Sequence, residues 1–487
     1  ARREAGEAVA AEALAHHWGE SDEPVRAVAP LREAAEGALR VASHEAAEGH
    51  LARLAEILTK HGGEIEGAAA LRAWTALERG RLARLRGDLE GACVLLAEAV
   101  EAEMGTEPST VTVQLVRGWG EAERQRGRTG DAIVLQRRAV ALSTRLAPGD
   151  EARREEIQSR LALAVALRAA GEVGEALEVA QAAVAAAESL RDRSLLARGL
   201  NTAGICLMNL GRHRDALEPV ERATAMWRER GDVRNLVAGL NNLGIVYERL
   251  VELDRALRAY GEALRVAHQI GHRRAVLANH INAGQVLQWL DNQSEAMRHF
   301  EQVIEACRER SDDVAQGLAL VNLAWSRIHE GEDAAAERLL TQAQDLAERT
   351  RDHTLTVSAL LLRSRVAWAN RDFDEAEGAA DEALSRIRSA GGGDELTAAL
   401  RLRAKAESGQ GRTATARRTL GEALTEARRS RERREEIQTH LVLAEIHPLA
   451  RHPWRHARHL RRARRLLERF PVPLLRRLMA ELAHPNR

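Results

Sequence analysis

Aromatic residues are scarce in this sequence. Phe, Trp and Tyr together make up 3% of the 487 residues, although hydrophobic residues reach 45%. The core must therefore be built from Ala, Leu and Val, a composition that favours helices over sheets. A chain of this length would form about three or four domains unless it is one long repeat array, so repeats are the first pattern to examine.

Several kinds of chemistry are also missing. The three cysteines, Cys93, Cys206 and Cys307, lie far apart and form no Cys-x-x-Cys pair, so we expect reduced core thiols. Lys60 and Lys405 are the only lysines, and neither precedes Ser or Thr, which excludes a phosphate-binding P-loop in this chain. The zinc-protease, hydrolase and calcium-loop motifs are absent too. We therefore predict no catalytic residue, no metal site and no cofactor.

Positively and negatively charged residues are equally numerous in this sequence. Lys plus Arg and Asp plus Glu each total 72, so no overall field favours nucleic acid or a membrane. No stretch of 18 uncharged apolar residues occurs, and charged residues run through the N-terminus in place of a signal peptide. We expect a cytoplasmic protein without a membrane partner. The first residue is Ala, so we expect a processed start or a piece of a longer chain.

Small residues, in contrast, recur at a fixed interval. Gly, Ala or Ser stands at positions 80, 120, 164, 204, 244, 284, 324, 364, 404 and 444, and from 164 onward every step is 40 residues. Ala follows twelve residues later in nine of the ten copies, and again nineteen residues later in nine. Helices approach to about 8 Å only where the facing side chains are small. These positions therefore predict close helix pairs, one per repeat.

A turn separates the two helices of each repeat. Gly stands seven residues after the small position in most copies, as at Gly87, Gly211 and Gly331. Between Pro148 and Pro448 the only proline is Pro219, and apolar residues follow helical spacing throughout. Each 40-residue repeat is thus predicted to be helix, tight turn, helix.

These residues resemble the tetratricopeptide repeat family. Leu243, Gly244 and Tyr247, followed by Ala256, Tyr260 and Ala263, match its L-G-x-x-Y, A, F, A pattern. The period of 40 is similar to that of the long-helix subtype found in kinesin light chains and in the regulatory arms of bacterial signalling ATPases. The resemblance implies an all-α, right-handed superhelical solenoid of about ten hairpins over residues 67–470. Residues 1–66 are expected to form off-register helices, and residues 471–487 a capping helix and tail.

The N-terminal segment carries a second, shorter resemblance. His16, His17 and Trp18, followed by a segment that begins at Pro24, look like the junction that joins the ATPase portion of bacterial multidomain regulators of the STAND and LuxR types to their repeat arm. The resemblance implies an NTPase or effector domain upstream in the same polypeptide.

The first helix of each hairpin lines the inner face of such a solenoid. At 100° per residue, positions two before, one after and five after the small residue form one stripe turned away from the second helix. Asn occupies the same place in three successive repeats, at Asn242, Asn282 and Asn322, so we expect a ladder of amides facing an open groove. An amide both donates and accepts hydrogen bonds, as an extended peptide backbone requires. The competing interpretation is that these residues belong to the repeat pattern and stay solvated.

Two tryptophans fall on this stripe in adjacent repeats. Trp289 and Trp325, flanked by charged residues, have the composition of an interaction hot spot, although large side chains also fill space between repeats. The predicted partner-binding set comprises Asn209, Asn242, Arg249, Asn282, Gln285, Trp289, Asn322, Trp325, His329 and Arg365. We therefore predict a non-catalytic interaction scaffold or sensor arm of a bacterial signalling or transcription regulator, with a protein or peptide segment in the inner groove.

The C-terminal region is locally basic and rich in histidine. Arg458, Arg461, Arg462, Arg464 and Arg465 cover much of one predicted helix, which we interpret as a solvated cap. A nucleic-acid-associated regulator that binds through this helix is the alternative function, although base-reading aromatics are missing. His447, His452, His456 and His459 are interpreted as solvated or capping residues, because no Cys or carboxylate completes a metal-ligand set.

Overall fold

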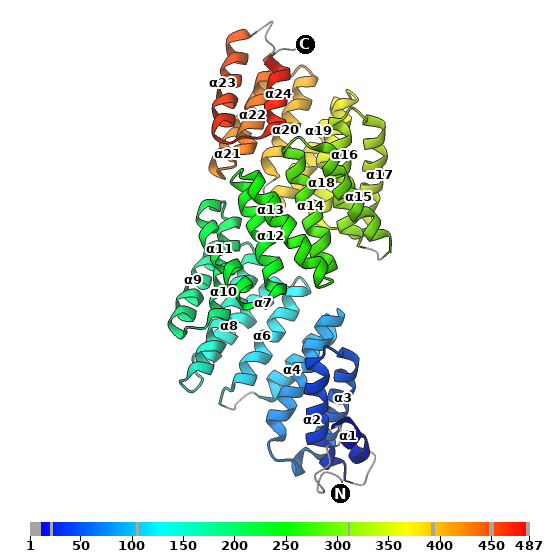
Figure 1. Cartoon of the computed structure of the whole chain (residues 1–487), viewed down its shortest axis with the longest axis vertical. Coiled ribbons are helices and arrows are strands. Elements are labelled where there is room, and N and C mark those ends of the chain that lie inside the picture. The colour runs from blue at the N-terminus through cyan, green and yellow to red at the C-terminus, as the bar shows by residue number, and fades with distance from the viewer. Residues whose placement is uncertain are drawn as a thin grey trace. The chain divides into compact units, whose positions relative to one another are not determined.

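The computed structural model describes residues 11–19, 23–103, 107–309, 312–390, 395–447 and 452–483. Every regular element in these ranges is a helix, coloured from blue to red along the chain in Figure 1. The chain divides into two compact units, Ala1–Cys206 and Leu207–Arg487. This division falls inside the repeat array, and the boundaries expected at residues 66 and 470 remain predictions.

The first unit contains the N-terminal helices and the first hairpins. Apolar side chains of α1, α2 and α3, among them Ala15, Leu31 and Leu54, pack together and against Ala68 at the start of the array. The elements are α1 (Ala11–Gly19), η1 (Pro24–Ala27), α2 (Val28–Arg40), α3 (His44–His61), η2 (Gly62–Glu64), α4 (Ala68–Arg86), α5 (Leu89–Ala102), α6 (Thr110–Gln125), α7 (Thr129–Ser143), α8 (Asp150–Ala169), α9 (Val173–Leu190) and α10 (Arg193–Asn209), whose last three residues belong to the second unit.

The second unit continues the alternation of first and second helices and ends in one extra helix. Its elements are α11 (His213–Arg230), α12 (Val233–Arg249), α13 (Leu253–Gln269), α14 (Arg273–Trp289), α15 (Gln293–Glu309), α16 (Asp313–His329), α17 (Asp333–Thr350), α18 (His353–Ala369), α19 (Phe373–Ser389), α20 (Leu396–Gly409), α21 (Thr413–Arg429), α22 (Arg433–Glu445), α23 (Pro453–Arg469) and α24 (Pro473–Ala483). Consecutive helices pack against each other. The all-α hairpin array is thereby confirmed, with α12–α13 as the fifth hairpin and α22–α23 as the tenth.

The repeated small residue makes room for a large one on the second helix. A Cβ atom added to Gly244 would lie 2.4 Å from the Tyr260 ring, and one added to Gly284 would lie 2.5 Å from the Phe300 ring. Both rings are fully buried and stand sixteen residues after the glycine. In the eighth hairpin, where Ser364 takes the small position, its hydroxyl donates to the backbone carbonyl of Ala376, twelve residues on, at 2.7 Å. Close helix packing therefore explains the 40-residue pattern.

The turns inside the hairpins use the left-handed backbone region. The predicted turn glycines have positive φ values, for example +83° at Gly87 and +77° at Gly331. Hairpins that lack Gly at this position adopt the same conformation, with φ of +63° at Val251 and Asp291. The repeat geometry thus imposes this conformation even on residues that rarely adopt it.

The core consists of successive small clusters, most of them shared by neighbouring helices. Cys93, Cys206 and Cys307 are buried and free, as expected from the sequence. Burial raises the pKa of each thiol, which keeps it protonated.

Candidate functional site

Within the second unit the tenth hairpin packs directly against the fifth. The Arg249 guanidinium on α12 donates to Glu432, the residue before α22, at 3.1 Å. In return, Arg434 on α22 donates to Glu248 at 2.9 Å. These partners are more than 180 residues apart in the sequence. The repeats after the fifth hairpin therefore return to it.

An apolar cluster and α24 complete this closure. Tyr247 and Tyr260 of the fifth hairpin share one buried cluster with Ile437 of α22 and Leu475 of α24. Arg477 of α24 also pairs with Asp291, just after α14, at 2.9 Å. Helix α24, which the sequence predicted to be a simple cap, thus also covers first helices of earlier repeats. The inner face of residues 207–487 is consequently bordered by the fifth and tenth hairpins and by α24.

This face contains a cavity of about 400 Å³, here called the inner cavity, whose lining includes Ile245, Gln285, Trp289, Asn322, Trp325 and Arg365. A neighbouring pocket of about 530 Å³ shares Arg365 and adds His329, Trp368, Lys405, Glu445 and Glu481. Both volumes lie in the range of small-molecule and peptide-anchor sites.

One repeat position supplies a lining residue from six successive hairpins. The residue directly after the small position is Ile245, Gln285, Trp325, Arg365, Lys405 and Glu445 in turn. These side chains project from α12, α14, α16, α18, α20 and α22. The rotation of 100° per residue therefore predicted the stripe that lines the cavities. The same calculation applied to the last two repeats predicts Lys405 and Glu445 as well.

The two tryptophans and a histidine form an aromatic group, called the aromatic stack after its stacked pair Trp325 and His329, while the Trp289 ring is tilted by 59° to that of Trp325. The ring centroids of Trp289 and Trp325 are 5.7 Å apart, and His329 stacks on Trp325 at 3.8 Å. The Arg434 guanidinium lies 4.4 Å from the centre of the Trp289 ring. Burial lowers the pKa of His329 to about 4, so this ring is neutral near pH 7. Since both tryptophans are partly exposed, the stack presents apolar surface to the cavity.

The asparagine ladder is only partly as expected. Asn282 donates to Asn241 of α12 at 3.0 Å, and Asn322 accepts from Gln285 of α14 at 3.2 Å. The expectation that these amides face only open space is therefore wrong for Asn282 and Asn322, because their side chains form hydrogen bonds between the first helices of neighbouring repeats. Both nevertheless line the inner cavity. Asn242 is half-buried on α12 and does not line it.

Two other predicted residues also differ from expectation. Asn209 is exposed at the end of α10 and does not line the inner cavity. Arg249 reaches the cavity, but its guanidinium is held by the ion pair with Glu432, which is 8% exposed. Arg249 therefore mainly joins the fifth hairpin to the tenth. The sequence could not show this role because Glu432 lies five repeats away.

Arg365 stands out among the charged groups of the interior. Arg401 pairs with the buried Glu435, and Lys405 pairs with Glu445 at 3.3 Å. Within the described ranges, Arg365 has neither an ion pair nor a side-chain hydrogen bond, although it lines both cavities. Burial lowers the pKa of Arg365 to about 10, so the group remains charged at pH 7. An unpaired cation in a cavity is an anion-binding group.

The C-terminal histidines are more buried than expected. His447 and His456 are 4% and 5% exposed, so neither is solvated. His456 fits the capping interpretation, because its Nδ1 lies 2.9 Å from the backbone carbonyl of Ala444 and 3.2 Å from that of His447, at the end of α22. His456 stands at the repeat position that Ala occupies in the other hairpins. No group of three candidate metal ligands occurs among the residues described. On α23, in contrast, Arg461, Arg462, Arg464 and Arg465 are exposed, whereas Ala463 and Leu467 are buried.

Comparisons with known proteins agree with this architecture. Residues 235–309 match the tetratricopeptide repeat family model, which confirms the resemblance for the fifth and sixth hairpins. No curated protein sequence matches the chain significantly. In the part of the chain that the structure describes, no helix is both long and apolar enough to cross a membrane.

Solved structures share the fold at low sequence identity. A Rap protein complexed with competence and sporulation factor is 13% identical, with a TM-score of 0.57, over 77% of this chain and all of that chain. The apo quorum sensor NprR from B. thuringiensis is also 13% identical, with a TM-score of 0.53, over 72% of this chain and 97% of that one. The chain thus shares the fold of these structures, and within it residues 235–309 match the tetratricopeptide repeat model.

Proposed function

We propose that this chain is a non-catalytic interaction module, the sensing arm of a bacterial signalling or transcription regulator, and that its inner cavity binds a peptide segment or effector. The observation that carries the proposal is the stripe of six residues at one repeat position, which line two neighbouring pockets and bring the apolar ring of Trp325 and the charge of Arg365 to the inner cavity. Repeat arrays use such inner surfaces for binding.

The lining defines the chemistry of the ligand. Trp289 and Trp325 offer an apolar face for an aliphatic or aromatic side chain. Arg365, which has no acidic partner within the described ranges, favours a carboxylate on the same ligand. The amides of Gln285 and Asn322 can exchange their mutual hydrogen bond for bonds to a peptide backbone. A short segment with one apolar and one acidic group fits this set.

The relatives in fold support a sensing role. One was solved in complex with competence and sporulation factor, and another is a quorum sensor, so the architecture is compatible with ligand sensing. We further propose a cytoplasmic location and an upstream NTPase or effector domain that receives the signal. The upstream domain depends on the junction-like segment near Trp18, of which residues 20–22 lie outside the described ranges.

A selection from a random linear peptide library, displayed on phage and panned on the whole chain, tests the proposal. Selected peptides are synthesised and titrated against variants. Trp325→Ala should weaken their binding at least about thirtyfold, because truncating a buried interface Trp costs about 2 kcal/mol. Asn322→Ala should weaken it about fivefold, since water can replace an amide hydrogen bond.

Trp454→Ala is the matched control, because Trp454 is 60% exposed on α23 and lines neither cavity. Circular dichroism and melting curves establish that each variant is folded. If no peptide binds, or if binding is insensitive to Trp325 and Arg365, the inner cavity is not the binding site. If instead only a nucleic acid binds, and changing Arg461, Arg464 and Arg465 abolishes that binding, the basic helix alternative holds. The salt dependence of that binding would then be steep.

A further inference from the structure

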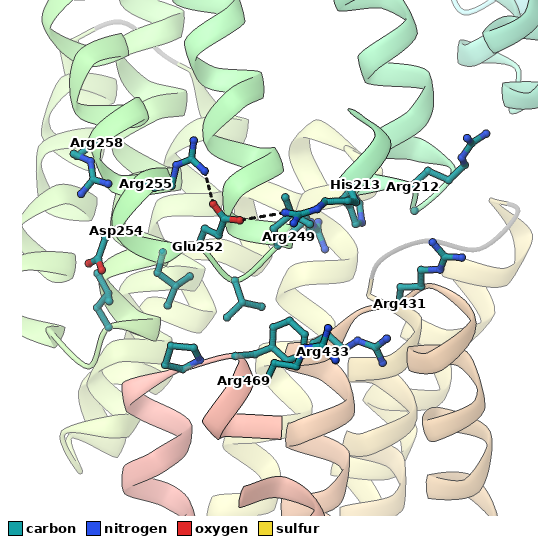
Figure 2. Close-up of a pocket in the computed structure, with 18 of the residues that line it drawn as sticks. Arg212, His213, Arg249, Glu252, Asp254, Arg255, Arg258, Arg431, Arg433 and Arg469 are labelled. Atoms are coloured by element: carbon teal, nitrogen blue, oxygen red, sulfur yellow. Dashed lines mark hydrogen bonds and ion pairs between the residues drawn. The ribbon is translucent and has the colours of Figure 1, made fainter. Parts of the chain in front are cut away.

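A second pocket, separate in chemistry from the inner cavity, lies where the turns of the fourth and fifth hairpins meet the α21–α22 connection and the end of α23. Its volume is about 830 Å³. Figure 2 shows side chains of α11, α12, α13, α22 and α23 gathered around it. We call it the arginine cleft, because its lining contains eight arginines, Arg212, Arg214, Arg249, Arg255, Arg258, Arg431, Arg433 and Arg469, against three carboxylates, Asp215, Glu252 and Asp254.

Several of these arginines are already neutralised. Arg212 pairs with Asp215 at 2.8 Å, and Arg255 pairs with Glu252 at 2.7 Å, the latter marked in Figure 2. Arg433 pairs with Glu436 at 2.9 Å. These pairs fix the wall of the cleft.

Three arginines from three different elements are not neutralised. Arg258 of α13, Arg431 of the α21–α22 turn and Arg469 at the end of α23 form no ion pair with any residue that the structure describes. All three are exposed, so none is needed to balance a buried charge. The excess positive charge of the cleft is therefore available to a ligand.

The backbone adds to this charge. Helices α11, α13 and α22 all begin at the cleft, with Arg212, Glu252 and Glu432 as their N-caps. At these three described helix starts, the side chain of the N-cap residue makes no capping hydrogen bond. Helix N-termini carry partial positive charge and favour anions.

The walls of the cleft are held close together. A Cβ atom added to Gly211, in the turn before α11, would lie 3.1 Å from the backbone oxygen of Ser430 in the turn before α22. Gly211 also has a φ of +69°, which favours glycine. The Phe470 ring is half-buried in the lining, with the Arg469 guanidinium 5.4 Å from its centre. The arginines are thus arranged around a defined opening.

From these observations we propose that the arginine cleft binds an oligophosphate group carried by a small ligand, such as a nucleoside triphosphate or inorganic tripolyphosphate. Arginine binds phosphate oxygens through two parallel hydrogen bonds, and several linked phosphates can neutralise several arginines at once. The volume lies in the range of pockets that enclose a ligand of this size. This site shares Arg249 with the inner cavity but differs from it in its excess of arginine, so the array would carry two ligand sites of different chemistry.

Calorimetric titration of the full chain at low salt with tripolyphosphate, ATP and inorganic phosphate tests the proposal. Tripolyphosphate and ATP should bind at one site, and inorganic phosphate should bind much more weakly. Tighter binding of ATP than of tripolyphosphate would assign the ligand to the nucleotides, and equal binding would assign it to the phosphate chain alone.

Variants locate the site. Arg258→Gln and Arg469→Gln should each weaken tripolyphosphate binding about tenfold, the usual effect of losing a charged hydrogen-bonding group. Asp254→Asn should strengthen it several-fold, because Asp254 lies in the lining and repels an anion. Arg464→Gln is the matched control, since Arg464 is exposed on the same helix as Arg469 but outside the cleft.

Three results would overturn the proposal. The first is the absence of saturable binding of either tripolyphosphate or ATP. The second is an equal loss of binding in Arg464→Gln and Arg469→Gln, and the third is binding of a single-stranded oligonucleotide that the α23 variants abolish. The second and third results would each indicate a general basic surface and not a cleft.

Discussion

Arg249 and Glu432 form a 3.1 Å ion pair although 182 residues separate them in the sequence. Glu432 is almost fully buried, and Arg249 is partly exposed. The pair joins the fifth hairpin to the tenth beside the inner cavity. A linear stack of repeats would hold the two residues far apart.

Breaking this closure should loosen the tenth hairpin before it unfolds the rest. Glu432→Gln removes the carboxylate and leaves Arg249 with a weaker partner, which should cost about 1–2 kcal/mol. Hydrogen exchange should accelerate in α22–α24 and in α12. The exposed pair of Arg222 and Glu218 provides the control, and Glu218→Gln should leave exchange unchanged. Unaltered exchange in α22–α24 of the Glu432 variant would show that the ion pair does not hold the closure.

The close approach at Gly244 gives a prediction with an internal control. Gly244→Ala places a Cβ atom 2.4 Å from the Tyr260 ring and should destabilise the fold by about 1–3 kcal/mol. Gly261→Ala, one residue after Tyr260, meets nothing within 4 Å and should be neutral or stabilising by up to about 1 kcal/mol, because Ala favours helix. Chemical denaturation measures both.

The Gly244→Ala variant also tests how far the loss of stability spreads along the chain. Tyr260 belongs to the cluster shared with α22 and α24, so hydrogen exchange should rise there as well as in α12 and α13. Helices α18 and α19 share no residue with that cluster and should keep their protection. Uniform loosening of the whole chain would contradict the picture of repeats that interact with defined neighbours.

Arg365 and Arg401 should respond in opposite ways to the same substitution. Arg365 has no acidic partner within the described ranges, so Arg365→Met should stabilise the fold by about 1 kcal/mol while weakening binding of an acidic ligand. Arg401 pairs with the buried Glu435, so Arg401→Met should destabilise the fold by about 3 kcal/mol because that carboxylate loses its closest cation and keeps Arg434 at 3.9 Å and the Gln438 amide at 3.2 Å. Thermal denaturation and ligand titration of both variants decide. A destabilised Arg365→Met would show that this arginine has a structural role.

The histidine pair of α22 and α23 predicts a loss of stability in acid. His440 is 1% exposed, and its Nδ1 lies 3.1 Å from that of His459. Burial, with the nearby charges of His459, Arg428 and Arg462, lowers the pKa of His440 to about 4 despite the opposing charge of Glu436. The unfolded chain therefore binds more protons than the folded one between about pH 6.5 and 4. Stability should fall as pH decreases through that window.

The size of this effect is up to about 3 kcal/mol for His440, since one pKa unit corresponds to about 1.4 kcal/mol. His440→Gln should flatten the stability profile between pH 6.5 and 4, as measured by urea denaturation at each pH. His353→Gln, on the exposed start of α18, serves as the control. An unchanged slope in His440→Gln would mean that this histidine is protonated in the folded state.

The sequence by itself determined the helical hairpin and the residues that point inward. Glycine or alanine at a fixed 40-residue interval is a local packing requirement, as the contact between Gly244 and Tyr260 shows. The helical period then placed Gln285, Trp325 and Arg365 on one stripe, because side-chain direction on a helix depends only on spacing. The family resemblance followed from the same local pattern.

Only the tertiary structure decided what that inner face became. The pairing of Arg249 with Glu432, the placement of α24 against α14 and the arginine cleft all depend on small rotations between successive repeats that accumulate over five hairpins. No residue pattern in the sequence shows this total rotation, since each repeat contacts mainly its neighbours. The interactions between distant repeats form only after the rotations of all the intervening repeats have added up. The sequence therefore determined the residues that line the cavity, and the accumulated rotation between repeats brought the tenth hairpin to its border.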